Sequence, residues 1–170
     1  MKPHYLLILS LLLLNLSCSQ SVFVVRHAEK AAPSGGNMMS SDVPLSEAGV
    51  ERAALLRDLL RNKDIQSIYS TNTLRTRSTA MPLSEALNIP IQLYHPRDTL
   101  QQLAASVRSS KGSVLLVGHS NTVDDLVNII AGKNLVPADL PETVYDRMFI
   151  LSKKKSGMRF KQKSYGKVYP

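Results

Sequence analysis

The sequence predicts an α/β domain built on a mainly parallel sheet. Three observations support this fold class. Short β-rich runs alternate with longer helical stretches from residue 21 onward. Runs such as residues 22–25 are continuously apolar, which is typical of strands covered by helices on both faces. The 170 residues, 44% hydrophobic and 20% charged, fit one compact domain and exclude a long disordered chain.

The expected elements follow one another in regular order. Strands are expected at 22–25, 65–69, 91–94 and 114–117, and helices at 45–60, 73–87, 99–108 and 123–131. Ser46 is a preferred helix N-cap residue, whereas Pro82 predicts a kink or interruption in the second helix. The runs 145–151 and 158–165, joined by a lysine-rich turn with Gly157, predict a closing hairpin.

Residues 1–19 are expected to be a secretory signal that lies outside the fold. Lys2 precedes an apolar run over residues 5–14, which is shorter than the about 20 residues needed to span a bilayer, and small residues follow it. Two processing outcomes stay open. Leu16-Ser17-Cys18 resembles the end of a bacterial lipoprotein signal, so residues 1–17 would be removed and Cys18 lipidated. Cleavage after Ser19 would instead release a soluble protein.

We favour the lipoprotein outcome, because the lone cysteine at this place has no better structural explanation. Both outcomes predict export to the periplasm or outer envelope of a bacterium, with residues 20–170 as a single domain. A lipid on Cys18 would form a short membrane tether with the site turned away from the membrane.

The net charge of +8 comes entirely from the end of the chain. Residues 1–146 contain 13 basic and 13 acidic side chains, whereas the last 24 residues contain eight lysines and arginines and no acid. The simpler interpretation is a solvated edge hairpin whose lysines block edge pairing. The alternative is attraction to an anionic membrane surface or a polyanionic substrate. Aromatic residues are few and no nucleic-acid-binding module is visible, so no nucleic-acid partner is expected.

Polar side chains follow three of the expected strands at their carboxyl ends. Arg26 and His27 follow the first strand, Arg75 lies just beyond the second, and His119 follows residues 114–117. Ligands of such sheets bind at this edge, so we expect the four side chains to converge. Arginine forks suit phosphate oxygens, and a histidine can attack with one ring nitrogen while the other is held. Either motif alone would usually be an ordinary surface feature, and the shared location favours an anion site.

Four motifs, in this order, resemble those of the histidine phosphatase superfamily, the phosphoglycerate mutase-like clan. They are Val24-Val25-Arg26-His27-Ala28-Glu29-Lys30, Pro44-Leu45-Ser46-Glu47-Ala48-Gly49, Tyr69-Ser70-Thr71 followed by Arg75 and Thr79-Ala80, and Val117-Gly118-His119-Ser120-Asn121-Thr122. The resemblance covers roughly residues 21–166 and is closest to small phosphohistidine-phosphatase-like members of branch 1. It implies a three-layer α/β/α sandwich and phosphoryl transfer through a phosphohistidine.

The resemblance also implies roles for individual residues. His27 matches the nucleophile, Arg26 and Arg75 match the phosphate-binding arginines, and His119 matches the second histidine of the pocket. Glu29 and Asn121 are expected on the substrate side, where Glu29 orients its neighbours.

The sequence offers several carboxylates as candidates for the proton donor and does not decide between them. Hydrolysis of an alkyl phosphate needs an acid at the leaving oxygen. The resemblance points to an acidic residue after the third strand, and Asp98 is the nearest one, although it fits a helix N-cap equally well. Asp124 and Asp125 are second candidates, but they are more typical of charges that favour a helix start.

We therefore expect an exported phosphatase that hydrolyses phosphomonoesters through a phosphohistidine on His27. Its partners would be a small phosphorylated substrate and a phosphate or sulfate ion, held in an open pocket because only short segments connect the strands. No cysteine or histidine cluster has the spacing of a zinc site, so neither metal nor cofactor is expected. The alternatives are a non-catalytic phosphate-binding envelope lipoprotein and a protein phosphohistidine phosphatase. The oligomeric state is left open.

Overall fold

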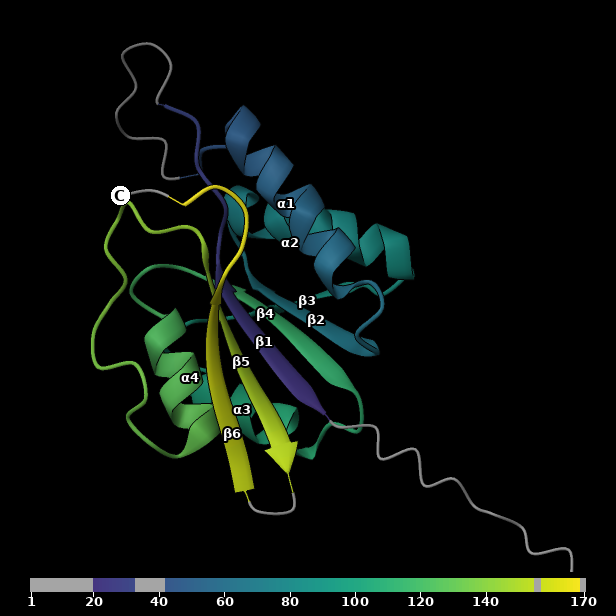
Figure 1. Ribbon diagram of the computed structural model, residues 1–170, viewed down its shortest axis with the longest axis vertical. Coiled ribbons are helices and arrows are strands. Elements are labelled where there is room, and N and C mark those ends of the chain that lie inside the picture. The colour runs from purple at the N-terminus through teal and green to yellow at the C-terminus, as the bar shows by residue number, and fades with distance from the viewer. Residues whose placement is uncertain (1–19, 33–41, 155–156, 169–170) are drawn as a thin grey trace, which may run out of the picture.

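A six-stranded sheet with helices on both faces forms the protein, as the computed structural model shows for residues 20–32, 42–154 and 157–168 (Figure 1). The elements are β1 (Ser21–Arg26), α1 (Glu47–Leu60), β2 (Ile65–Thr71), α2 (Leu74–Leu87), β3 (Ile91–Tyr94), α3 (Leu100–Ser109), β4 (Ser113–Gly118), α4 (Val123–Ala131), β5 (Arg147–Lys154) and β6 (Gly157–Ser164). The expected α/β/α fold is confirmed. Helix α2 continues through Pro82 without interruption.

The strand order β3-β2-β4-β1-β5-β6 places β1 near the middle of the sheet. Strands β3, β2, β4 and β1 are parallel, and the β5–β6 hairpin adds two antiparallel strands beside β1. In this register Arg26 lies opposite Gly118, and the His27 N–H donates to the Gly118 carbonyl at 2.9 Å. The residues that follow β1 and β4 therefore meet at one edge of the sheet.

Two hydrophobic cores hold the layers together. Successive β1 residues point to opposite faces, so Val24 packs with the core under α3 and α4, whereas Val25 packs with the core under α1 and α2. Each fully buried aliphatic side chain contributes on the order of 2 kcal/mol to stability. The described residues of both cores lie between Val22 and Tyr165, so residues 20–170 contain all of them.

The start of α1 is fixed to the segment after β1. As expected, Ser46 is the N-cap residue, and its hydroxyl accepts a hydrogen bond from the Gly49 N–H at 3.2 Å. A Cβ on Gly49 would collide with the Glu29 carbonyl oxygen. Gly49 therefore allows the helix to lie directly against the segment that contains His27.

Residues 1–19, for which a secretory signal and lipidation of Cys18 were predicted, lie outside the described residues. Within the described ranges, none of the helices has the length and apolar character needed to cross a bilayer.

Candidate active site

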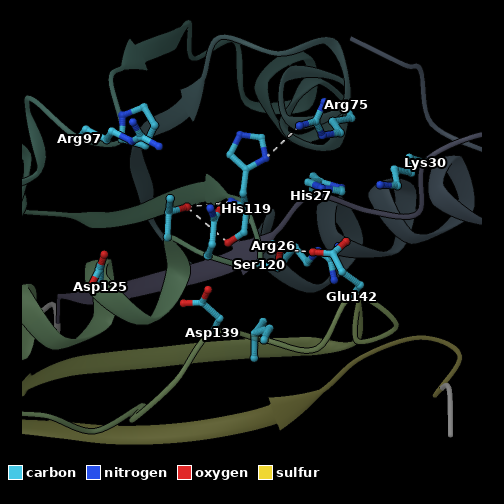
Figure 2. A pocket seen from close by; sticks show the side chains of 14 residues that line it. Arg26, His27, Lys30, Arg75, Arg97, His119, Ser120, Asp125, Asp139 and Glu142 are labelled. Carbon is cyan, nitrogen blue, oxygen red and sulfur yellow. Dashed lines mark hydrogen bonds and ion pairs between the residues drawn. The ribbon is translucent and has the colours of Figure 1, made fainter. Parts of the chain in front are cut away.

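An open pocket of about 860 Å³ lies at the carboxyl ends of β1 and β4 (Figure 2). Arg26, His27, Arg75, His119 and Asn121 all line it. The convergence that strand order predicted is therefore present in the structure. Two further cations, Lys30 and Arg97, line its rim and add to the positive charge.

His27 is held in the tautomer that a nucleophile requires. Its Nδ1 lies 2.7 Å from the Ala28 carbonyl oxygen. A carbonyl oxygen can only accept, so Nδ1 carries the proton and Nε2 retains its lone pair. Burial lowers the pKa of His27 to about 3, assisted by the charges of Arg26 and Arg75. The ring is thus neutral at neutral pH and can attack an electrophile through Nε2.

His119 lies edge-on to His27, with 5.5 Å between ring centroids. Its Nδ1 is 3.3 Å from Nη2 of Arg75 and its Nε2 is 2.8 Å from Oγ1 of Thr71. A guanidinium can only donate, so Nδ1 accepts and Nε2 carries the proton. Burial, followed by the charge of Arg75, lowers the pKa of His119 to about 4. His119 is therefore also neutral in the ligand-free pocket.

The Thr71 hydroxyl allows His119 to change tautomer. Oγ1 of Thr71 accepts from His119 and donates to Oγ1 of Thr76 at 3.0 Å, and Thr76 in turn donates to the Thr71 carbonyl at 2.8 Å. If Thr71 instead donates to Nε2, Nδ1 can carry the proton and donate to a bound oxyanion. The hydroxyl chain thus supports either protonation pattern of His119.

Arg26 is almost completely buried, with 1% of its surface exposed, and its guanidinium is bound to the segment before β5. Its Nη2 forms an ion pair of 2.7 Å with Oε2 of Glu142, and its Nη1 donates to the Pro141 carbonyl at 2.9 Å. The guanidinium also lies 4.2 Å from the centroid of the Tyr145 ring. Because an unpaired buried charge is costly, Glu142 stabilises Arg26 in the ligand-free state.

Glu142 is a pocket residue that sequence reasoning missed. Its second carboxylate oxygen accepts from the Ser120 hydroxyl at 2.5 Å, so Glu142 connects the end of β1 to the loop after β4 (Figure 2). This hydrogen bond, followed by the charge of Arg26, holds the pKa of Glu142 below its usual range. Glu142 belongs to none of the four motifs. The fact that its segment returns to β5, beside β1, is the only signal that could have pointed to it.

The carboxylates proposed from the sequence take different positions. Oδ2 of Asp98 lies 2.8 Å from Nδ1 of His95, and the Asp98 side chain is 76% exposed and does not line the pocket. Asp125 lines the pocket, whereas Asp124 is buried beside it, and burial raises the pKa of Asp124. Asp139, which the sequence did not suggest, also lines the pocket.

Glu29 lies under α1 and does not line the pocket. Its carboxylate pairs with the Arg52 guanidinium at 2.7 Å, and both side chains are buried. Arg52 also donates to the carbonyls of Tyr165 and Lys167. The structure thus places Glu29 in an ion pair that joins the β1 segment, α1 and the end of the chain. In the described part of the chain, no group of three or more His, Cys, Asp and Glu is arranged to hold a metal ion.

Comparison with known proteins adds a family and a fold. The model of the histidine phosphatase superfamily (branch 1) matches residues 22–97. No curated protein matches the chain. Among solved structures, the protein histidine phosphatase SixA complexed with tungstate has a TM-score of 0.64 at 20% identity, covering 85% of this chain and 97% of its own. The SixA protein from Agrobacterium tumefaciens has a TM-score of 0.60 at 24% identity, with coverages of 86% and 97%.

A mycobacterial glucosyl-3-phosphoglycerate phosphatase with inorganic phosphate has a TM-score of 0.62 at 16% identity, with coverages of 88% and 98%. At these identities the solved structures establish the shared fold. The family match runs from β1 through β3 with α1 and α2, so this part of the chain is similar to the histidine phosphatase superfamily (branch 1).

Proposed function

We propose that the protein is a phosphatase that hydrolyses phosphomonoesters through a phosphohistidine on His27. The observation that carries the proposal is the neutral His27 ring, whose Nδ1 is bound to the Ala28 carbonyl inside a pocket with two arginines. That arrangement leaves Nε2 as a nucleophile beside groups that bind phosphate oxygens.

In the first step, Nε2 of His27 forms a bond to phosphorus and the ester P–O bond breaks. Arg75 and Arg26 hold the phosphoryl oxygens, and His119 donates from Nδ1 after its tautomer changes. Donors of this kind each contribute about 100-fold to 1000-fold in rate when they match the transition state better than the substrate. In the second step, water attacks phosphorus, the N–P bond breaks, and His27 returns to its neutral form with phosphate released.

Glu142 is the proposed proton donor to the leaving oxygen. Glu142 lines the pocket, and its carboxylate directly contacts the guanidinium of Arg26. A phosphate dianion bound at Arg26 would raise the pKa of Glu142, because like charges close together disfavour ionisation. Protonated Glu142 would then donate to the leaving alcohol in the first step, and its carboxylate would accept a proton from water in the second.

The pocket suits small phosphorylated substrates with further negative charge. It is open, and Lys30 and Arg97 at its rim lie beyond the two arginines proposed to bind phosphate. A protein phosphohistidine is the second candidate substrate, because an open pocket admits a side chain and SixA of the same fold is named as a protein histidine phosphatase. Comparing turnover of a phosphohistidine peptide with that of an alkyl phosphate distinguishes the two.

We also propose that the protein is exported and held by a lipid on Cys18. In support, β1 begins at Ser21, at the end of the sheet opposite the pocket, so a short tether would leave the pocket facing solvent. Palmitate labelling of the full chain tests this. Labelling that is lost in Cys18→Ala supports the anchor, and labelling that persists in Cys18→Ala, or is absent from the wild type, contradicts it.

Hydrolysis of nitrophenyl phosphate by residues 20–170 tests the activity. We expect turnover that persists with a chelator and is lost in His27→Ala, with circular dichroism showing both proteins folded. Loss with chelator alone would contradict metal independence. Phosphate binding without turnover in the folded wild type would favour the non-catalytic binding protein instead.

A further inference from the structure

A second hollow, of about 490 Å³, lies at the other end of the sheet from the pocket. Five cations line it, and we call it the basic groove. They are Lys63 from the loop after α1, Lys154 from β5, and Arg159, Lys161 and Lys163 from β6. The first residue of β1, Ser21, also lines the basic groove, so the chain enters the domain there.

Strand alternation gathers the charges of β6 on one face. Met158 and Phe160 pack against the core under α3 and α4, so the residues between and after them point to the opposite face. Arg159 lies opposite Ser152 and Lys161 lies opposite Ile150, which places both over the amino end of β1. Arg159, Lys161 and Lys163 are all exposed. The cations therefore form one surface and are not spread around an edge strand.

The basic groove has a clear excess of positive charge. Its lining contains five cations and one carboxylate, Asp64. None of the ion pairs found between described residues involves Lys154, Arg159, Lys161 or Lys163. Lysines that only block edge pairing would not need to gather on one face of the β5–β6 hairpin. An anionic partner accounts for the shape and the charge together.

We propose that the basic groove binds the phosphodiester headgroups of anionic phospholipids at a membrane surface. Its only aromatic lining residue in the described chain, Phe23, is buried against the core, so the groove lacks the stacking platform typical of a nucleic-acid site. Cys18 is three residues from Ser21, within about 10 Å of extended chain. A lipid there would bring the basic groove to the bilayer. This proposal does not depend on phosphatase activity.

Binding of residues 20–170 to vesicles tests the proposal, because this part contains both cores and lacks the apolar leader. We expect binding to phosphatidylcholine vesicles that contain phosphatidylglycerol and none to phosphatidylcholine alone, with binding weakened by salt. Each cation near an anionic leaflet contributes roughly a fivefold factor, so Arg159→Gln/Lys161→Gln/Lys163→Gln should lower the partition coefficient about 100-fold.

The matched control is Arg57→Gln/Arg77→Gln/Lys133→Gln, which removes the same charge from residues that do not line the basic groove. We expect this control to keep most of the binding and both variants to keep the wild-type melting temperature. An equal loss in the two variants would overturn the proposal, because net charge alone would then explain binding. Absence of wild-type binding to the anionic vesicles, or tighter binding to a single-stranded RNA than to them, would also overturn it.

Discussion

The carboxylate of Glu142 lies 2.7 Å from the guanidinium of Arg26, so the arginine of the Arg-His motif already holds an anion in the ligand-free protein. Arg26 is 1% exposed and Glu142 is 69% exposed. The glutamate can therefore move toward solvent, whereas the arginine is held in place. A bound phosphate would either replace the Glu142 carboxylate as the anionic partner of Arg26 or contact Arg26 together with it.

Replacing Glu142 should affect substrates according to their leaving group. We expect Glu142→Gln to lower kcat for an alkyl phosphate by about 100-fold, because general acid catalysis is lost. A nitrophenyl phosphate, whose leaving group needs little protonation, should be hydrolysed at close to the wild-type kcat. Steady-state kinetics on the two substrates measures the difference.

Asp98→Asn is the matched control for Glu142→Gln, since Asp98 is exposed and outside the pocket lining. It should leave both substrates unaffected. If Glu142→Gln lowers KM equally for both substrates without changing kcat, Glu142 acts only as a competitor for Arg26. If Asp98→Asn instead selectively slows the alkyl phosphate, the proton donor is Asp98.

Arg75 and Arg77 offer a comparison within one helix. Both lie in α2, but only Arg75 lines the pocket and contacts His119. We expect Arg75→Met to lower kcat/KM by about 100-fold or more, because a charged donor to the phosphoryl oxygens is removed. Arg77→Met should change it less than about twofold. Similar losses in the two variants would show that the effect comes from total charge.

The protonation of the two pocket histidines can be observed by nitrogen NMR. At pH 5.5 we expect both rings to be neutral, with the proton on Nδ1 of His27 and on Nε2 of His119, because their pKa values lie at about 3 and about 4. A titration of either ring near the ordinary value would contradict this assignment.

The same pKa values predict how stability depends on pH. In the unfolded chain both histidines have their ordinary pKa of about 6.5. In the folded chain the pKa is about 3 for His27 and about 4 for His119. The unfolded state thus binds more protons between those limits, so these histidines should lower the free energy of unfolding as the pH falls from 6.5 toward 3. Urea titrations of wild type and of a His27→Gln/His119→Gln variant measure this contribution as a difference in slope.

Glu29 should matter for stability more than for the reaction. Its partner Arg52 is 3% exposed, and removal of one member of such a buried pair typically costs about 3 kcal/mol or more. We expect Glu29→Ala to lower the free energy of unfolding by that amount, with KM nearly unchanged in the folded fraction. A large rise in KM with unchanged stability would return Glu29 to the substrate side of the pocket.

Sequence patterns predicted the fold well because each element carried its own signal. The continuous apolar run that became β1 and the Ser46 cap of α1 are local features, and the structure confirms both. The helix predicted over residues 73–87 is present as α2, and it continues through Pro82, so the possible interruption there does not occur. The position of His27, Arg75 and His119 followed from a general rule of parallel sheets.

The remaining parts of the site depend on contacts across the chain that no local pattern encodes. Glu142 reaches Arg26 from 116 residues away, through an irregular segment between α4 and β5. Glu29 lies two residues after His27, yet its pairing with Arg52 turns it toward α1. Motif position alone therefore located the pocket but did not identify all of its carboxylates.

Trapping the phosphoenzyme tests the central claim most directly. Residues 20–170 should be mixed with a labelled phosphomonoester, quenched rapidly, and mapped by mass spectrometry. We predict one phosphate on His27, stable in alkali and labile in acid, that is absent from His27→Ala. Turnover by His27→Ala, or phosphate found on another residue of the active wild type, would contradict the phosphohistidine mechanism.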